Sequence, residues 1–287
     1  MRRRLAAVCG ALVAGTVAIG STQQPRFSSS IEAVRLDVLV TRDGRPVRDL
    51  GPDEFEVRDN GVLQEVDLVS FEEVPLSVVM ALDTSASVEG ARLDHLREAV
   101  GALVGGLQPD DQAGLVTFSH VVADACHPTG DFARVRAAID RVRASGDTAL
   151  ADGAYAGLVL AESGERRPLL VVFSDGLDTS SWLLPEEVLE AAKRADTVAY
   201  VVTTERVSQS EFLRDLADAT GGGVFRVEST GDLAATFLRV LNEFRYRYLV
   251  SFTPRGVATG GWHSLRVRVR RSNVDVRARP GYQAGSS

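Results

Sequence analysis

The stretch SVVMALDTSAS, residues 77–87, decides the fold of this chain. Its first six residues, Ser77–Leu82, are a short apolar run of the kind that forms a fully buried strand. Three similar runs follow further along the chain: AGLVTF at 113–118, LLVVF at 169–173 and VAYVV at 198–202. Strands that are buried on both faces are typical of parallel sheets covered by helices. The stretch therefore predicts an α/β sheet with a polar loop beginning at Asp83.

Apolar residues between these runs repeat at helical spacing. They form three stripes: Leu93, Leu96, Val100, Leu103 and Leu107; Phe132, Val135, Ile139 and Val142; Phe237, Val240, Leu241 and Phe244. Alternation of strands and helices over roughly 75–245 predicts a doubly wound, mostly parallel, Rossmann-like sheet. We interpret all three stripes as core.

Both ends of the chain predict β structure instead. In the segment 31–74, apolar Val34, Leu36, Val38 and Val40 alternate with other residues, and Asp43-Gly44 and Asn60-Gly61 are hairpin-type turns. In the segment 246–283, Leu265, Val267 and Val269 alternate with arginines. Neither segment has enough strands to be stable alone. We therefore expect the two ends to form one small β-sandwich-like domain, with the α/β domain of residues 75–245 inserted into it.

The charges of the two end segments are opposite, which favours their pairing. Residues 31–74 carry twelve acids and five arginines, whereas residues 245–287 carry nine arginines and only Asp275 as an acid. Opposite charges on facing strands stabilise pairing modestly. The alternative is that the C-terminal arginines form an anion-binding surface, but alternation along a strand also produces an ordinary solvated face.

The beginning of the chain has the pattern of a secretory signal peptide. Arg2, Arg3 and Arg4 precede an uncharged run that ends in Ala18-Ile19-Gly20, a small-x-small cleavage site. We expect residues 1–20 to be removed, residues 21–30 to be a polar linker and residues 284–287 to be a tail. The protein is then secreted or periplasmic, with no transmembrane segment in the mature chain. The alternative is a retained N-terminal anchor.

Composition excludes several classes of function. The 287 residues carry 32 basic and 39 acidic side chains, a net charge of −7 that argues against nucleic-acid partners. Two cysteines exclude a disulfide framework. The four histidines form no His-Glu-x-x-His motif, and neither a Gly-x-Ser-x-Gly elbow nor a Walker A loop occurs.

Five oxygen-bearing side chains follow the predicted strands. The motif Asp83-x-Ser85-x-Ser87 follows the first strand, Thr148 stands just before a helix, and Asp175 follows the strand LLVVF. Open α/β sheets bind ligands at the carboxyl ends of their strands. Carboxylates and hydroxyls are hard donors that suit Mg²⁺, Mn²⁺ or Ca²⁺. The sequence therefore predicts a metal site, although each serine is equally consistent with a helix N-cap.

Three neighbouring features have a weaker connection with this site. Asp152 lies four residues after Thr148 and is either positioned behind the ligands or an acid favoured in the first turn of a helix. His120 follows the strand AGLVTF and either approaches the metal edge or is an ordinary surface histidine. The stretch Asp178–Ser181 continues the loop after Asp175 and either shapes the rim of the site or consists of ordinary polar loop residues.

The order of these side chains resembles the von Willebrand factor type A domain. In that family Asp-x-Ser-x-Ser, a Thr and an Asp form a metal-ion-dependent adhesion site. The resemblance covers about 75–245. It implies that Ser85 and Ser87 ligate the metal directly, that Thr148 does so in one conformation, and that Asp83 and Asp175 act directly or through water. It also implies that the open coordination position accepts a carboxylate from a partner protein.

The flanking segments resemble a family of secreted, acidobacterial-type proteins related to von Willebrand factor type A. The resemblance rests on LDVLVTRDGRPV and DEFEVRDNG before the α/β domain, and on YRYLVSFTPRG, LRVRVRR and VRARPGY after it. We therefore expect a secreted binding or adhesion protein that captures an Asp or Glu carboxylate of a partner through Mg²⁺ or Mn²⁺. The alternatives are a metal-dependent hydrolase or phosphatase and a scaffold with a structural metal.

Overall fold

The computed structural model describes residues 33–70, 74–162, 166–174, 177–204 and 211–285. The predicted signal peptide and linker, residues 1–30, lie outside these ranges, and so does Asp175. Residues 31–287 form one compact unit. No helix among the described residues has the length and apolar character needed to cross a membrane.

A six-stranded sheet forms the centre of the α/β domain, in the order β11-β10-β9-β6-β7-β8. All neighbouring pairs are parallel except β7 with β8, which is antiparallel. The strands are β6 (Leu76–Asp83), β7 (Gln112–Phe118), β8 (Val122–Thr129), β9 (Arg167–Ser174), β10 (Val198–Thr204) and β11 (Gly223–Val227). The four predicted buried strands are thus confirmed as β6, β7, β9 and β10.

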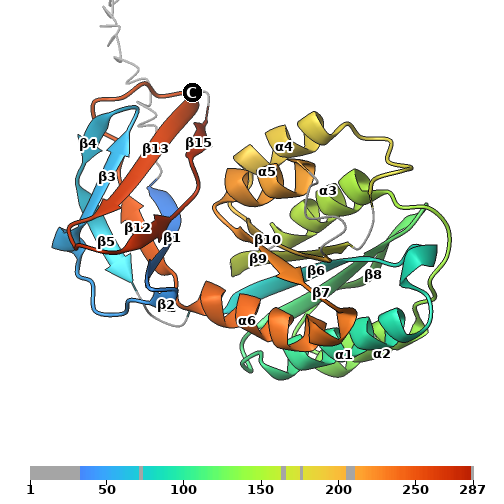
Figure 1. Ribbon diagram of the computed structural model, residues 1–287. Coiled ribbons are helices and arrows are strands. Elements are labelled where there is room, and N and C mark those ends of the chain that lie inside the picture. Colours follow the sequence, from blue (N-terminus) through green and yellow to red (C-terminus); the bar gives the residue numbers. More distant parts are fainter. Residues whose placement is uncertain (1–32, 71–73, 163–165, 175–176, 205–210, 286–287) are drawn as a thin grey trace, which may run out of the picture. The chain divides into compact units, whose positions relative to one another are not determined.

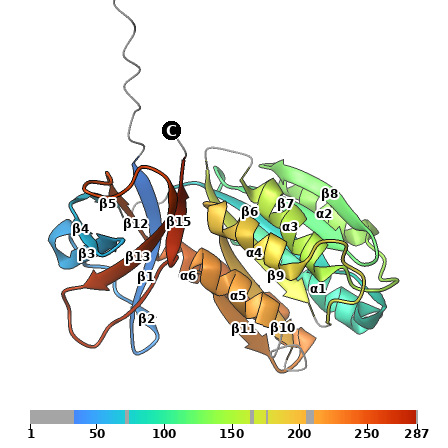
Figure 2. The ribbon, with the colours of Figure 1, turned by 90° about the horizontal axis from the view of Figure 1, so that it is seen from above.

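Six α-helices in the described part of the chain cover the two faces of this sheet. They are α1 (Ala91–Gly105), α2 (Phe132–Arg141), α3 (Leu150–Ala161), α4 (Pro185–Arg194), α5 (Glu211–Thr220) and α6 (Leu233–Arg245). Helices α1, α2 and α6 lie on one face and α3, α4 and α5 on the other (Figures 1 and 2). The prediction of a doubly wound α/β fold is therefore confirmed.

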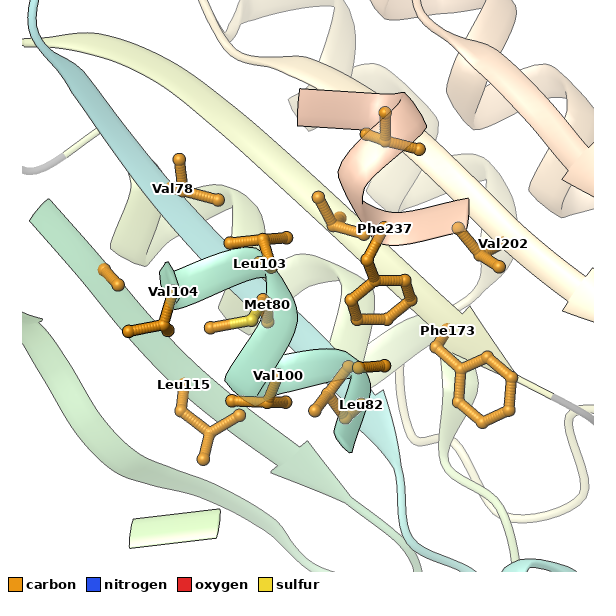
Figure 3. Close-up of a cluster of buried hydrophobic side chains, with 14 of the residues drawn as sticks. Val78, Met80, Leu82, Val100, Leu103, Val104, Leu115, Phe173, Val202 and Phe237 are labelled. Atoms are coloured by element: carbon orange, nitrogen blue, oxygen red, sulfur yellow. The ribbon is translucent and has the colours of Figure 1, made fainter. Parts of the chain in front are cut away.

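The predicted helical stripes face the core, with most of their apolar residues buried and Leu107, Phe132 and Val142 half-buried. Val100, Leu103 and Val104 of α1 and Phe237 of α6 pack against side chains of the strands, among them Met80 at the centre of the cluster (Figure 3). A second cluster on the opposite face joins α3, α4 and α5 to the same strands. Because both faces are covered, all eight residues of β6 are buried.

The two ends of the chain combine into a two-sheet β domain. One sheet has the order β14-β1-β12-β5, with β2 beside β1, and the other has the order β15-β13-β3-β4. The N-terminal strands are β1 (Val34–Arg42), β2 (Arg45–Pro46), β3 (Phe55–Asp59), β4 (Val62–Gln64) and β5 (Val66–Ser70). The C-terminal strands are β12 (Tyr248–Phe252), β13 (Gly261–Val269), β14 (Asp275–Arg277) and β15 (Gly281–Ala284).

Both sheets of this domain mix strands from the two ends. Strand β1 pairs antiparallel with β12 and β14, and β3 pairs antiparallel with β13. Apolar side chains of both ends fill the space between the sheets, with Phe55, Val57, Tyr248 and Phe252 in the core. The expectation of a sandwich built from both ends is therefore confirmed.

Charge pairing between the ends occurs mostly near the strand ends. Arg271 forms ion pairs with Asp49 at 2.7 Å and with Glu54 at 2.5 Å. Within the β3–β13 ladder the charges offset one another, because Arg268 lies opposite Glu56 but Arg266 lies opposite another arginine, Arg58. Like charges at opposed positions disfavour pairing. The apolar core, more than charge complementarity, therefore holds the sandwich together.

A buried arginine joins the sandwich to the α/β domain. Arg247, between α6 and β12, is 1 % exposed. Its guanidinium donates to the Tyr200 hydroxyl on β10, to the carbonyl of Gly221 at 2.7 Å and to the carbonyl of Asp37 on β1 at 3.2 Å. Asp37 also forms an ion pair with Arg167 of β9. These contacts fix the base of the α/β domain, at the opposite end of β6 from Asp83.

Candidate metal centre

Asp83 is the last residue of β6 and is fully buried. Its Oδ1 accepts a hydrogen bond from the Ser85 amide at 2.9 Å, and its Oδ2 accepts one from the Ser174 hydroxyl at 2.7 Å. Ser174 is the last residue of the adjacent strand β9. A buried carboxylate is costly unless it is paired or coordinates a metal. The chain therefore positions a desolvated anion where β6 and β9 end.

The two motif serines present their hydroxyls to one another. The Oγ atoms of Ser85 and Ser87 are 2.9 Å apart. Ser85 stands at the N-cap of a short 3₁₀ turn, Ala86–Val88, yet its side chain makes no capping hydrogen bond. The capping interpretation therefore fails for Ser85. Its hydroxyl forms a hydrogen bond with the Ser87 hydroxyl instead.

Backbone hydrogen bonds join the loop that carries Ser85 and Ser87 to the loop that carries Thr148. The Ala86 amide donates to the carbonyl of Gly146 at 3.0 Å, and the Ser145 amide donates to the carbonyl of Thr84 at 2.9 Å. Gly146 has a φ of +76°, and a Cβ there would lie 1.9 Å from the Nδ1 atom of His120. His120 is thus adjacent to this loop, and the positive φ together with the nearby ring favours glycine at position 146.

Thr148 lies nearly buried, with 6 % of its surface exposed. Its amide donates to the Thr179 hydroxyl at 3.0 Å, and its carbonyl accepts from the amides of Thr179 and Ser180. The loop after β9 is therefore tied to Thr148 from the other side. Of the five predicted ligands, four are described, and these contacts bring their loops together. The position of the fifth, Asp175, lies outside the described residues.

Asp152 has a structural role that the sequence did not reveal. It lies in the first turn of α3, as expected for one of its two interpretations, but its carboxylate accepts hydrogen bonds from other loops. The amide of Trp182 donates to both carboxylate oxygens, at 3.2 and 3.0 Å, and the amide of Leu183 donates to Oδ1 at 2.9 Å. Asp152 therefore anchors the loop after β9.

Asp178 fastens the same loop to the start of α3. Its carboxylate accepts from the amides of Ala151 and Ser181 at 2.8 and 3.0 Å, and from the Ser181 hydroxyl at 2.6 Å. Carboxylates at a helix N-terminus are favoured because the amides there lack partners within the helix. The expectation that Asp178–Ser181 shapes the rim of the site thus has a physical basis, because a loop pinned in this way has a defined course.

The donor set fits a hard divalent cation better than a soft one. Among the residues that the structure describes, no group of three or more His, Cys, Asp or Glu side chains is placed to hold a metal. Cys126 is buried and free, and it belongs to the apolar cluster beneath α1 and α2. The remaining candidate is the oxygen-rich cluster of one buried carboxylate and neighbouring hydroxyls, which suits Mg²⁺, Mn²⁺ or Ca²⁺.

Comparison with known proteins identifies the α/β domain. The family model of the von Willebrand factor type A domain matches residues 77–239, more than half of the chain. The chain belongs to the von Willebrand factor type A family. Domains of this family are typically binding modules, not enzymes, and they bind divalent metals.

Curated relatives of this von Willebrand type A protein are themselves described only in general terms. A UPF0353 protein of Nocardia farcinica is 26 % identical over 235 residues, covering 67 % of this chain and 69 % of its own length. An uncharacterized protein of Synechocystis sp. is 29 % identical over 104 residues, covering 35 % of this chain and 24 % of its own length. The chain thus spans only about a quarter of the Synechocystis protein.

Solved structures with the same fold include a von Willebrand factor type A protein from Catenulispora acidiphila. The match has a TM-score of 0.54 and 12 % identity, and it covers 90 % of this chain and 74 % of that one. Proximal thread matrix protein 1 from the mussel byssus, solved with a zinc-occupied adhesion-site motif, has a TM-score of 0.53 and 17 % identity. That match covers 65 % of this chain and 49 % of the mussel protein.

Proposed function

We propose that this protein binds a divalent metal through Asp83, Ser85, Ser87, Thr148 and Asp175 and uses it to capture a carboxylate of a partner protein. Mg²⁺ or Mn²⁺ is the expected ion, with Ca²⁺ as a further candidate. The observation that carries the proposal is a buried Asp83 carboxylate that accepts from the Ser85 amide, together with Ser85 and Ser87 hydroxyls that lie 2.9 Å apart. A desolvated anion next to neutral oxygen donors is an arrangement that a cation completes.

The charge of the donor set supports carboxylate capture. Two carboxylates and three hydroxyls leave a divalent ion with few anionic ligands in its own shell. Mg²⁺ prefers six oxygen ligands and usually retains water, so one position stays open to exchange. An Asp or Glu side chain of another protein supplies both the missing ligand and the missing charge. The bound metal therefore supplies the attraction, and this chain's residues hold it at the loop surface.

The proposed compartment follows from the N-terminal pattern. We propose export and removal of residues 1–20, because three arginines, an apolar run and Ala18-Ile19-Gly20 precede the folded region. The intact mass of the exported protein measures this directly. A new N-terminus near Ser21 supports the proposal, whereas a retained segment supports an anchor.

Metal-dependent capture of a partner tests the proposed function. The immobilised protein is exposed to an envelope extract of its source in Mg²⁺, washed, and eluted with EDTA. We expect a protein that elutes with EDTA and is absent when Asp83→Ala is used. Asp147→Asn is the matched control, because it removes an exposed acid next to Thr148 that is not among the proposed ligands. Equal capture by wild type and Asp83→Ala contradicts the proposal.

A further inference from the structure

Large apolar side chains are exposed at the edge of the sheet where the metal site is proposed. In the loop after β9, Leu177 is 64 %, Trp182 93 % and Leu184 60 % exposed, and in the turn after β7, Val121 is 59 % exposed. We call these four residues the apolar rim. Ten large apolar side chains are exposed in the described part of the chain, so four of the ten lie in two short loops. Because β7 and β9 run parallel to β6 on either side of it, both loops lie at the same edge of the sheet. Apolar side chains exposed together mark interaction sites, whereas single exposed apolar residues do not.

Hydrogen bonds connect both loops of the apolar rim to the residues around Thr148. The Thr179 hydroxyl accepts a hydrogen bond from the Thr148 amide, and the Thr179 amide donates one to the Thr148 carbonyl. On the side of β7, the carbonyl of Ser119 accepts from the amide of Ala149, and the Ser119 amide donates to the carbonyl of Val121. Both loops of the apolar rim are therefore held to the chain on either side of Thr148, a proposed metal ligand.

The most exposed member of the apolar rim has a fixed backbone. The Trp182 amide donates to both oxygens of the Asp152 carboxylate, while the neighbouring Leu183 packs into the core beneath α3 and α4. An indole held in place by its backbone loses little conformational freedom when a partner covers it. Aromatic side chains presented in this way are typical of the residues that dominate protein interfaces.

We propose that the apolar rim is a second contact for the same partner, and that it selects carboxylates flanked by large apolar side chains. The inference rests on the proposed function, because the metal-bound carboxylate brings the partner to the rim. The partner segment carries an Asp or Glu for the metal and, within about two residues, a Leu, Phe, Tyr or Trp that packs on Trp182.

The charges around the rim favour a protein segment over a lipid surface. Residues 177–190 contain no Lys or Arg, and Glu186 and Glu187 follow the rim directly. Surfaces that bind anionic lipid rely on basic residues beside their apolar ones. The same acids repel a partner carboxylate when the metal is absent. Binding to the rim should therefore depend on the metal, although the rim itself does not ligate it.

Selection from a random peptide library tests this inference. A library of twelve-residue peptides displayed on phage is selected on the full protein in Mg²⁺ and eluted with EDTA. We expect enriched peptides to contain an Asp or Glu with a large apolar residue within about two positions. For individual peptides, Trp182→Ser should weaken binding about thirtyfold, as for a dominant interface residue. The Mg²⁺ affinity of Trp182→Ser, measured by calorimetry, should equal that of the wild-type protein.

Leu63→Ser is the matched control, because Leu63 is 52 % exposed but lies on β4 of the sandwich. It should leave peptide binding unchanged. If enriched peptides are acidic without apolar neighbours, or bind Trp182→Ser as well as wild type, the inference is wrong and carboxylate capture stands. If no peptide elutes with EDTA, the proposed function fails, and the inference fails with it. If the wild-type protein sediments with anionic vesicles and Trp182→Ser does not, the apolar rim binds a membrane, and the inference of a protein partner is wrong.

Discussion

Replacing Arg247 by methionine removes the most deeply buried arginine that connects the sandwich to the α/β domain. The change keeps an unbranched side chain of similar length but removes the guanidinium. Four hydrogen bonds disappear: two to the Tyr200 hydroxyl at 3.0 and 2.8 Å, one to the carbonyl of Gly221 at 2.7 Å, and one to the carbonyl of Asp37 at 3.2 Å. The Tyr200 hydroxyl keeps its hydrogen bond to Glu243 at 2.8 Å but loses the cation on its other side.

Two opposing terms set the size of the effect. Hydrogen bonds from a charged donor contribute about 1.5–3 kcal/mol each, so four of them give an upper bound of roughly 6–12 kcal/mol. Removing the guanidinium also relieves a desolvation penalty of several kcal/mol, which methionine does not incur. We therefore expect a net loss of about 3 kcal/mol in the free energy of unfolding. For a domain of this size that corresponds to a fall in Tm of about 6–12 °C.

Urea unfolding followed by far-ultraviolet circular dichroism measures this loss. Arg266→Met is the matched control, because Arg266 is exposed on β13 of the same sandwich. It should change the free energy of unfolding by less than about 0.5 kcal/mol. If Arg247→Met unfolds within about 1 kcal/mol of wild type, the buried guanidinium does not hold the two domains together and the reasoning is wrong.

Three further predictions concern the site and the sandwich. Asp152→Ala removes the acceptor of the Trp182 amide, so hydrogen exchange at that amide should accelerate; an unchanged exchange rate would contradict the anchoring role. Gly146→Ala places a Cβ against the neighbouring histidine ring at a φ of +76°. Thermal unfolding should therefore show a loss of about 1–2 kcal/mol in the free energy of unfolding, and calorimetry should show weaker metal binding. Wild-type values in both measurements would refute this reasoning. A backbone hydrogen bond from Gly51 and the Arg271 guanidinium lower the pKa of Glu54. The ionised Glu54 carboxylate therefore stabilises the folded protein above pH 4.5, and this stabilisation is lost as the pH falls through the lowered pKa. Glu54→Gln should flatten the acid side of the plot of stability against pH, and an unchanged plot would count against this pairing.

Much of the fold was predictable because the spacing of apolar residues along a strand or helix is a local property of the sequence. The apolar runs at 77–82 and 169–173 became β6 and β9, and the alternation that starts at Val34 became β1. Strand β8 was missed, because its edge position leaves most of its residues exposed or half-buried and its apolar pattern is weak. The domain limits at 75 and 245 remain a prediction that a truncated chain would test.

The parts of the site that escaped prediction depend on contacts between distant segments. Asp83 was identified because its motif is contiguous, but its bond to Ser174 joins residues 91 positions apart. The anchoring role of Asp152 and the 93 % exposure of Trp182 both result from a loop that folds back on α3, so that residues 30 positions apart come into contact. Buried Arg247 likewise looked like one arginine among many. Side-chain type and spacing predict donors, whereas the tertiary fold decides which donors meet.

Calorimetric titration of Mg²⁺ and Mn²⁺ into the wild-type protein and Asp83→Ala tests the central claim most directly. Asp83 supplies the only buried carboxylate among the described candidate ligands, so its loss should abolish binding. Asp147→Asn, which changes an exposed neighbouring acid, should titrate like wild type. The account predicts saturable binding by wild type and Asp147→Asn and none by Asp83→Ala. No binding by wild type at millimolar metal, or equal binding by all three proteins, would contradict it.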